Sequence, residues 1–311
     1  MKKVMIAGGS GFIGSHLVDA LVRNNYEVIV VDDLSSGLES NLSKILNKIE
    51  FLKCDIATLK HDFNVDIIIN LASRASRVEW ETFPVEVALS NSIGNDNLIK
   101  IALKNDAMYL YASSSEIYGN PDVFPTPESY IGRVSTTGSR SSYDEGKRFG
   151  EALIKAYEKE YGLKNIIMRF FNTYGPRMRG GNFYGRVVDR FIQQAINEEP
   201  LTLYGNGNQT RSFTYVSDAV QAILLLLKKG SPGEIYNVGN DNEIKILELA
   251  DKVISMCKSN SSKLFFPLPE SDPLRRSADI SKIRSLGFTH RVSLERGLIN
   301  IIEQFELDQK E

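Results

Sequence analysis

The chain has 311 residues, of which 42% are hydrophobic and 24% are charged, and its net charge at pH 7 is −2. This length allows one large domain or two fused lobes, and the balanced charge provides no basic surface for a nucleic acid or an anionic membrane. No apolar run approaches the ~18 residues typical of a membrane span. The two cysteines, Cys54 and Cys257, provide neither a disulfide framework nor a metal-ligand spacing, so we expect a cytoplasmic globular protein without a metal.

Short apolar runs alternate with longer amphipathic segments through the first half of the chain. Continuous apolar runs are typical of parallel strands that are buried on both faces, and they lie at residues 4–6, 28–31, 67–69, 109–111 and 166–168. Helical spacing of apolar residues falls between them, at residues 13–24, 84–104 and 143–161. This alternation predicts an α/β fold with a doubly wound parallel sheet, the Rossmann arrangement, covered by helices on both faces.

The composition changes after Phe171. Asn, Gly, Pro and Arg become frequent over residues 172–181, and a second turn-rich stretch follows at residues 204–211. We interpret this half as a smaller mixed α/β lobe for the substrate, because ligands of open α/β sheets bind outside the carboxyl ends of the strands. The predicted division is a dinucleotide-binding domain over residues 1–171 and a substrate lobe over residues 172–311, with some crossing of the chain between them.

A glycine-rich turn follows the first predicted strand. Gly8, Gly11 and Gly14 lie between that strand and the first helix, the context in which such a turn holds a dinucleotide pyrophosphate at a helix N-terminus. The second strand ends at Asp32, where a carboxylate binds a ribose 2′-hydroxyl and disfavours the additional phosphate of NADP. The expected cofactor is therefore NAD, although a glycine turn by itself is also compatible with a purely structural role.

Further residues near these elements complete the expected cofactor site. Asp55 and Ile56 follow the third strand and could flank the adenine, or Asp55 could instead cap the following helix. The full set of candidate cofactor residues is Gly8, Gly11, Phe12, Ile13, Gly14, Asp32, Asp55, Ile56, Leu71, Ala72, Tyr143 and Lys147.

Tyr143 and Lys147 are one helical turn apart in the predicted helix over residues 143–161, so both can face one reacting centre. A tyrosine is a poor base near neutral pH because its ordinary pKa is about 10. A lysine ammonium and a nicotinamide cation beside it favour the phenolate and lower that pKa. Ser114, just after a predicted strand, could hydrogen-bond the same substrate oxygen. Together with the glycine turn, this trio predicts hydride transfer with proton transfer at Tyr143.

Several further stretches carry motifs, at residues 114–119 (SSEIYG), 141–148 (SSYDEGKR), 172–178 (NTYGPRM), 185–188 (GRVV), 209–213 (QTRSF) and 275–280 (RRSADI). They resemble the extended short-chain dehydrogenase/reductases that act on nucleotide sugars, and the resemblance covers essentially the whole chain. Within that family, the sequence is most similar to the UDP-glucuronate decarboxylases, also called UDP-xylose synthases.

The resemblance implies roles for individual residues. Tyr143 takes the proton of the sugar C4 hydroxyl while C4 gives hydride to NAD, and Glu116 lies near C5 or C6, where it manages protons or water. Arg276 lies near the departing carboxylate of a uronate. Glu116 and Arg276 could instead be solvated surface charges. The candidate catalytic residues are thus Tyr143, Lys147, Ser114 and Glu116.

The resemblance also implies a nucleoside diphosphate sugar as substrate, whose pyrophosphate planar guanidinium groups can bind bidentately. Arginines are frequent in the second half, at Arg177, Arg179, Arg186, Arg190 and Arg211. Of these, Arg186 and Arg211 match family positions that contact the nucleotide or the sugar, whereas Arg179 and Arg190 are expected on the surface. The candidate substrate residues are Trp80, Asn172, Arg186, Arg211 and Arg276.

The chain departs from the decarboxylases that it resembles between residues 70 and 84. Arg74 and Arg77 stand where those proteins have prolines, and Trp80 stands where they have a tyrosine near the sugar. The two added cations could indicate a different or more anionic sugar, and Trp80 could equally be ordinary packing. Ser114 and Asn95 each replace a threonine.

Other reactions of the family are alternatives. Ser115 replaces the aspartate that protonates the leaving C6 hydroxyl in sugar 4,6-dehydratases, so dehydration is disfavoured. A 4-epimerase, a C4 dehydrogenase that releases the 4-keto sugar, or a non-catalytic NAD-binding sensor would each use the same fold. The resemblance further implies a homodimer that pairs through the helices over residues 84–104 and 143–161.

Overall fold

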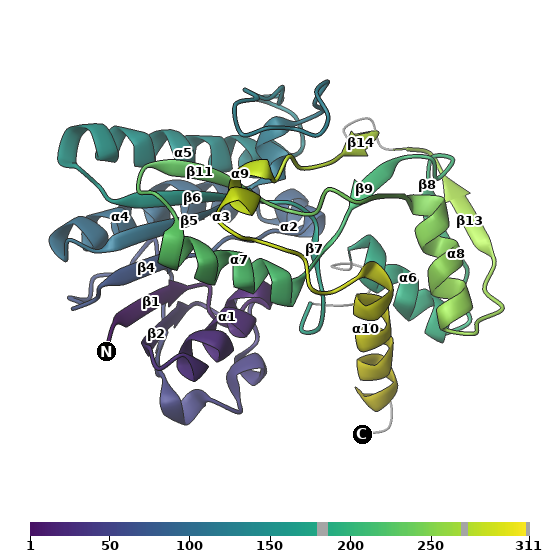
Figure 1. Cartoon of the computed structure of the whole chain (residues 1–311), viewed down its shortest axis with the longest axis horizontal. Coiled ribbons are helices and arrows are strands. Elements are labelled where there is room, and N and C mark those ends of the chain that lie inside the picture. Colours follow the sequence, from purple (N-terminus) through teal and green to yellow (C-terminus); the bar gives the residue numbers. More distant parts are fainter. Residues whose placement is uncertain (179–185, 269–272, 309–311) are drawn as a thin grey trace. The chain divides into compact units, whose positions relative to one another are not determined.

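The computed structural model of the chain describes residues 1–178, 186–268 and 273–308 (Figure 1). Contacts divide the chain into two compact units. The first consists of Met1–Ile117, Val134–Phe170 and Val220–Tyr236, and the second of Tyr118–Arg133, Phe171–Ala219 and Asn237–Glu311. The chain thus crosses between units at residue 171 and at several other points, and two domains divided at residue 171 stay a prediction. Among the described residues, no helix combines the length and the apolar character needed to cross a bilayer.

The first unit is built on a seven-stranded sheet with the order β11-β6-β5-β4-β1-β2-β3. Its strands are β1 (Lys3–Ala7), β2 (Glu27–Asp32), β3 (Glu50–Lys53), β4 (Ile67–Asn70), β5 (Met108–Ser114), β6 (Asn165–Phe170) and β11 (Glu234–Val238). The pairings from β3 through to β6 are all parallel. Because β2 and β3 extend the sheet to one side of β1 and β4, β5 and β6 to the other, the predicted doubly wound sheet is confirmed, with its switch point between β1 and β4.

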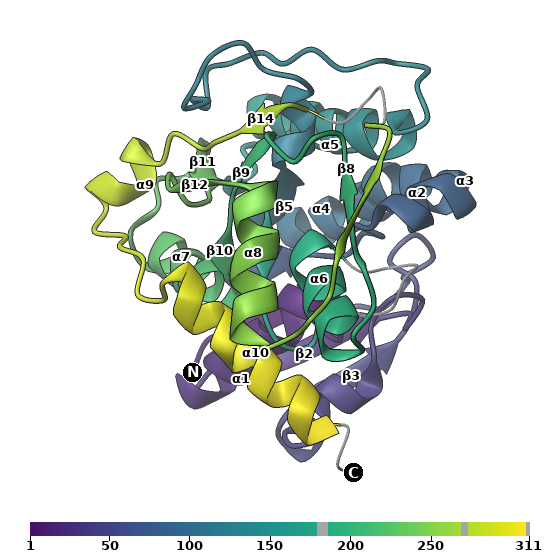
Figure 2. The same cartoon turned by 90° about the vertical axis from the view of Figure 1, so that its right-hand side faces the viewer.

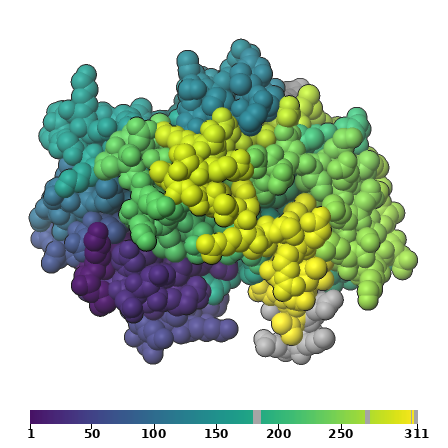
Figure 3. All heavy atoms as spheres, in the orientation of Figure 1, coloured from purple at the N-terminus to yellow at the C-terminus, as the bar shows by residue number. Residues whose placement is uncertain are grey.

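Helices cover both faces of this sheet. On one face, α4 (Asn95–Lys104) and α5 (Ser141–Tyr161) bury Leu98, Ile99 and Ile154 against alternate residues of the strands, such as Met5 and Ile29. On the other face lie α1 (Phe12–Arg23) and the later part of α7 (Val216–Lys229), as the two views show (Figures 1 and 2). The space-filling view shows the packed atoms of the N-terminal residues, in purple, at the surface (Figure 3). The apolar strands are therefore enclosed, as continuous apolar runs predict.

The predicted helix over residues 84–104 is interrupted. It consists of α3 (Pro84–Leu89), a π-helical segment η3 (Ser90–Gly94) and α4. Within it, the Asn91 side-chain amide donates to the Val87 carbonyl at 2.8 Å, and the Ser92 hydroxyl donates to the Ala88 carbonyl at 2.7 Å. Such bonds from side chains compete with the backbone ladder and bend helices, which accounts for the wider turn at this point.

The second unit contains short sheets and helices, which confirms the mixed α/β content predicted for this half. Strand β9 (Thr210–Ser212) lies between β12 (Glu243–Lys245) and β14 (Arg275–Arg276). The remaining elements described are β7 (Thr173–Tyr174) paired with β10 (Thr214–Tyr215), β8 (Leu201–Tyr204) paired with β13 (Lys263–Phe266), and helices α6 (Val187–Ile196), α8 (Ile246–Met256), α9 (Ser281–Ser285) and α10 (Leu294–Asp308).

Candidate active site

The glycine turn between β1 and α1 is closed to side chains. Gly8 has a φ of +78°, and a Cβ atom there would lie 2.8 Å from the backbone of Leu71 and of Ala72. A Cβ atom at Gly14 would lie 2.1 Å from the Gly8 carbonyl oxygen. No side chain therefore covers the backbone of the turn. Beside it lie the first helical amides, those of Phe12 and Ile13, which have no acceptor within the helix. This cradle fits the pyrophosphate of a dinucleotide.

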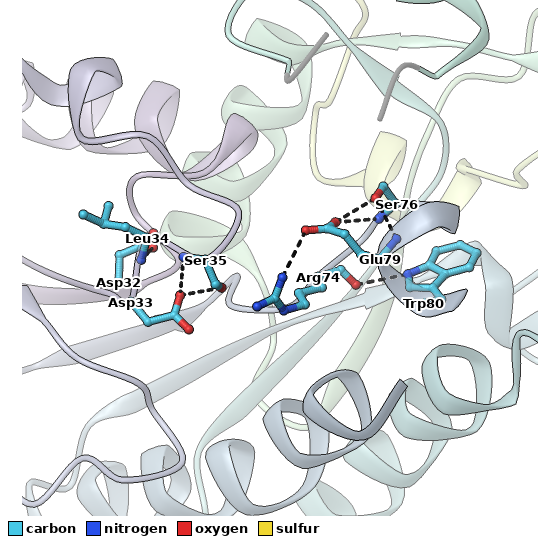
Figure 4. Close-up of polar contacts among 8 residues, drawn as sticks. All are labelled: Asp32, Asp33, Leu34, Ser35, Arg74, Ser76, Glu79 and Trp80. Atoms are coloured by element: carbon cyan, nitrogen blue, oxygen red, sulfur yellow. Dashed lines mark hydrogen bonds and ion pairs between the residues drawn. The ribbon is translucent and has the colours of Figure 1, made fainter. Parts of the chain in front are cut away.

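Asp32 ends β2 beside this turn and is buried. Its carboxylate accepts the Ser10 amide at 2.8 Å and the Leu34 amide at 2.9 Å, and burial raises its pKa above the usual range. Each carboxylate oxygen has a second lone pair, so ribose hydroxyls can still be accepted. The next residue, Asp33, accepts the backbone amide and the hydroxyl of Ser35 (Figure 4). The residues present thus fit the adenosine half of NAD.

Asp55 caps a turn rather than a helix. Its Oδ1 accepts the Ala57 amide at 2.8 Å, residues 56–58 form a turn, and the next helix begins only at Arg77. The alternative that Asp55 caps the following helix is therefore wrong, because the short turn leads into extended chain. Ile56 is buried against Gly94 of the π segment, where a Cβ atom would approach its side chain to 2.6 Å.

Tyr143 and Lys147 lie in the first turns of α5, next to the end of β5. The Lys147 ammonium donates to the Ala112 carbonyl at 2.8 Å and lies 5.8 Å from the centre of the Tyr143 ring. Burial lowers the pKa of Lys147 to about 7. Ser114 follows two residues after Ala112 on the same strand face, and its Oγ accepts the Glu116 amide at 3.2 Å. The structure therefore brings the predicted trio to one end of β5.

A buried ion pair lies beneath Lys147. Glu151, one turn further along α5, accepts bonds from Arg169 Nε at 2.9 Å and Nη2 at 2.7 Å, and from the Ser113 hydroxyl at 2.5 Å. Its attraction raises the pKa of Lys147 and so opposes the larger effect of burial. Arg169 already neutralises the charge of Glu151. The Lys147 ammonium can therefore stabilise a negative charge that forms at the active site.

Glu116 is paired with a residue that the sequence did not single out. Arg140, the N-cap residue of α5, makes an ion pair with Glu116, and its Nε lies 3.6 Å from an oxygen of Asp144. The Glu116 side chain is largely buried, so it is not the solvated surface charge allowed as an alternative. The sequence gives little indication that Arg140 belongs to the site, because an arginine before a helix is common.

Trp80 stacks on Tyr143. The two ring centroids are 4.4 Å apart and the ring planes are 17° from parallel. Trp80 belongs to α2 (Arg77–Thr82), and its indole N–H donates to the Arg74 carbonyl at 3.0 Å (Figure 4). The tryptophan predicted to contact the sugar therefore contacts the proposed base itself.

The two extra cations of this segment both have acidic partners. Arg74 lies 3.8 Å from the buried Glu79 carboxylate, with its guanidinium 4.4 Å from the centre of the Phe83 ring. Arg77 bonds to Glu81 at 2.9 Å on the exposed side of α2. Because each charge is matched locally, these arginines no longer indicate a more anionic sugar.

Asn91 is a buried polar residue that sequence reasoning missed. Its side-chain amide donates to the Ser73 hydroxyl at 3.1 Å, and its Oδ1 accepts the Tyr111 hydroxyl at 3.4 Å. It lies in the π segment, a feature that is frequent at functional sites. An asparagine in the middle of an apolar helical pattern was the available signal, because asparagine is a poor helix former.

In the second unit, two of the predicted substrate residues are neighbours. Strands β9 and β14 are parallel, and their register aligns Arg211 with Arg276. Residues aligned in this way project to the same face of the sheet, and the two arginines are only 8% and 6% exposed. Two buried arginines paired across neighbouring strands suit an anion such as a diphosphate or a carboxylate.

The other predicted substrate residues of this unit make backbone contacts. Asn172 donates to the Ser212 carbonyl at 3.1 Å, next to Arg211 on β9. Arg186 is exposed at the start of α6 and donates to the Thr173 carbonyl at 3.2 Å. Arg190 follows one turn later and bonds to the Thr202 carbonyl at 3.3 Å, whereas Arg179 lies outside the described residues. Among the described parts of the chain, no cluster of side chains could hold a metal ion.

Comparisons with known proteins show the family of the chain. The family model described as the NAD dependent epimerase/dehydratase family matches residues 4–239. UDP-glucuronic acid decarboxylase 1 of Danio rerio is 40% identical over 98% of this chain and 72% of its own length. UDP-glucuronic acid decarboxylase 3 of Arabidopsis thaliana is 41% identical over 98% of this chain and 89% of its own. The crystal structure of a UDP-glucose 4-epimerase of Thermotoga maritima with UDP-glucose is 30% identical and covers 99% of both chains with a TM-score of 0.90.

These matches bear on the sequence predictions in different degrees. The predicted resemblance, the fold class and the dependence on NAD are confirmed. The roles assigned to individual residues stay predictions, since no comparison tests them one by one.

Proposed function

The chain belongs to the NAD dependent epimerase/dehydratase family, and we propose that it is a UDP-glucuronate decarboxylase that works through oxidation at the sugar C4. The observation that carries the proposal is the Tyr143–Lys147–Ser114 arrangement at the end of β5. Identity of about 40% to two named decarboxylases, over 98% of the chain, supports the choice of reaction.

Three residues move or hold protons at C4. Tyr143 takes the proton of the C4 hydroxyl, and Lys147 stabilises the phenolate, since a buried ammonium gains most from an adjacent anion. Ser114 accepts the Glu116 amide, which leaves its own hydroxyl proton to hold the C4 oxygen. The glycine turn and Asp32 would hold NAD, which would supply the oxidising power for C4 and the hydride for its later reduction.

Loss of carbon dioxide follows from the position of the ketone. A C4 ketone makes the C5 carboxylate of a uronate a β-keto acid, so the C5–C6 bond breaks and its electron pair passes to the ketone oxygen. C5 then needs a proton in place of the carboxylate. Glu116, held by Arg140, is assigned to manage that proton, and Arg276 is assigned to the carboxylate before it leaves.

The second unit supplies the groups for the nucleotide. Arg211 and Arg276, buried side by side, provide planar donors for phosphate or carboxylate oxygens. Arg186 and Asn172 complete the proposed substrate residues. The expected substrate is therefore a nucleoside diphosphate sugar.

A 4-epimerase is the second candidate, because the Thermotoga maritima 4-epimerase shares the fold over 99% of both chains. Epimerisation uses the same proton transfer at Tyr143 and needs only rotation of the 4-keto sugar before hydride returns. A dehydrogenase that releases the 4-keto sugar would differ only in that last step.

A panel of nucleotide sugars separates these candidates. The purified protein, with any NAD retained, is incubated with UDP-glucuronate, UDP-glucose and UDP-N-acetylglucosamine, and the products are weighed by mass spectrometry. We expect UDP-glucuronate to lose one CO₂ and the other two to stay unchanged. An unchanged mass with altered chromatographic retention would establish epimerisation, and loss of two hydrogens would establish net oxidation. Either result would contradict decarboxylation.

A homodimer is also proposed, with helices α3, η3 and α5 at its centre. These three elements contact one another and expose apolar side chains at Val85, Leu89, Ile93 and Phe149. Exposed apolar side chains on neighbouring elements suit an interaction surface.

Sedimentation equilibrium at micromolar concentration should give the mass of a dimer for the wild type and of a monomer for Ile93→Asp. Leu264→Asp on β13 is the matched control, since both side chains are 48% exposed, and it should stay dimeric. A monomeric wild type would refute this proposal.

The cytoplasm is the proposed location. Neither Cys54 nor Cys257 forms a disulfide, and cysteines that stay reduced are typical of reducing compartments. Cell fractionation with an antibody against the chain would test it.

A further inference from the structure

We propose that Trp80 is a positioning residue, which holds the Tyr143 ring in the orientation that proton transfer requires. This inference rests on the proposed function, in which Tyr143 takes the proton from the substrate. It replaces the prediction that Trp80 binds the sugar directly.

The surface of Trp80 is already used by the protein. Its ring lies 4.4 Å from the Tyr143 ring at an angle of 17°, and the Arg140 guanidinium lies 5.3 Å from its centre. The indole N–H, its one polar group, donates to the Arg74 carbonyl. The exposed fraction of Trp80, 7%, is close to the 6% of Tyr143, but the polar group of Trp80 is already bonded to the protein. Its contact with the reaction therefore runs through Tyr143.

The stack restricts the motion of Tyr143. Val87 of α3 and Ala75 belong to the same apolar cluster as the two rings. Offset-stacked rings resist tilting because tilting opens a gap on one side. A phenol held in this way keeps its oxygen at one position relative to the substrate hydroxyl. A displacement of about 1 Å at a reacting group can lower the rate by about 100-fold.

Trp80 is itself fixed by the cap of a short helix. The Ser76 hydroxyl accepts the Glu79 amide at 3.3 Å, and the Glu79 carboxylate accepts the Ser76 amide at 3.2 Å, so the two form a capping box. The Arg74 side chain makes an ion pair with Glu79. The Arg74 backbone carbonyl accepts the indole N–H of Trp80. Figure 4 shows these four residues as one connected group. The chain of contacts therefore runs from the cap to Trp80 and then to Tyr143.

The first test measures turnover of Trp80→Phe and Trp80→Leu on whichever nucleotide sugar the wild type converts. Phenylalanine keeps a ring against Tyr143, so kcat should stay within about threefold, whereas leucine should lower kcat by about 10- to 100-fold with little change in KM. A raised KM with an unchanged kcat in Trp80→Leu would overturn the proposal and return Trp80 to the role of a direct substrate contact.

The second test needs no substrate, because Trp80 is the one tryptophan of the chain. Emission excited selectively from tryptophan therefore reports on this stack alone. Tyr143→Phe should leave the emission maximum and its quenching by acrylamide unchanged, while Tyr143→Ala should shift the maximum to the red and increase the quenching. Emission that is equally insensitive to both changes would show that the two rings are not stacked.

The third test changes the helix cap that holds Trp80 rather than Trp80 itself. Ser76→Ala removes one half of the capping box and should produce both the red shift and the fall in kcat. Arg77→Ala, which removes only the exposed pair with Glu81 on the same helix, should produce neither. A Ser76→Ala protein with normal emission and normal kcat would contradict the route through the cap.

The turnover of Tyr143→Phe and of Trp80→Leu together separates this inference from the proposed function. If Tyr143→Phe turns over normally, the role of Tyr143 is wrong whatever the emission shows. If Tyr143→Phe is inactive but Trp80→Leu has a normal kcat, only the role of Trp80 is wrong.

Discussion

Replacing Tyr143 with phenylalanine should lower kcat by about 10²- to 10⁴-fold, the usual contribution of a positioned proton-transfer group. The change removes only the hydroxyl, so the ring can keep its stack on Trp80 and its place beside Lys147. NAD binding should be retained, because the glycine turn and Asp32 are untouched. Steady-state turnover and calorimetric titration with NAD measure the two effects separately.

Tyr157→Phe is the matched control for this experiment. Tyr157 lies on the same helix, and its hydroxyl bonds to Asp96 at 2.6 Å rather than to any residue of the proposed site. Its loss should leave kcat unchanged. Full turnover in Tyr143→Phe would remove the catalytic assignment and favour a protein that only binds NAD.

Much of the fold was predictable because its signals are local. Apolar runs such as residues 28–31 are typical of strands enclosed on both faces, and the glycine turn indicated where the first strand passes into the first helix. The π segment was not predictable in the same way. Whether the side chains of Asn91 and Ser92 point to solvent or bond to carbonyls of the preceding turn depends on what packs against them, and that packing comes from distant parts of the chain.

The site was predictable where chemistry depends on sequence spacing. Tyr143 and Lys147 are one turn apart in any helix, so their proximity needs no tertiary information. The stack of Trp80 on Tyr143 joins residues from different helices, and the alignment of Arg211 with Arg276 depends on a strand register across a long separation. The expectation that Arg74 and Arg77 could indicate a more anionic sugar has a related weakness. The sequence shows the two charges but does not show the acidic residues that pair with them.

Lys147→Met should raise thermal stability while it abolishes most activity. Burial makes the ammonium costly and lowers its pKa to about 7, so a methionine of similar length removes that cost. The variant loses the bond to the Ala112 carbonyl and the attraction of Glu151, which offsets part of the gain. Activity should fall by at least about 100-fold, since the phenolate loses its cation. Lys159→Met, an exposed lysine on the same helix, should change neither property.

The gain in stability should depend on pH with a definite sign. Because the pKa of Lys147 is about 7 in the folded chain, below the ordinary lysine pKa of 10.5, the unfolded chain binds more protons between these two values. The free energy of unfolding of the wild type therefore rises with pH across that window. Methionine does not titrate, so its advantage should be greatest below about pH 7 and should shrink steadily toward pH 10.5. Thermal melts of both proteins across this range measure the difference, and a gain that grows with pH would show that Lys147 is charged and stabilising in the fold.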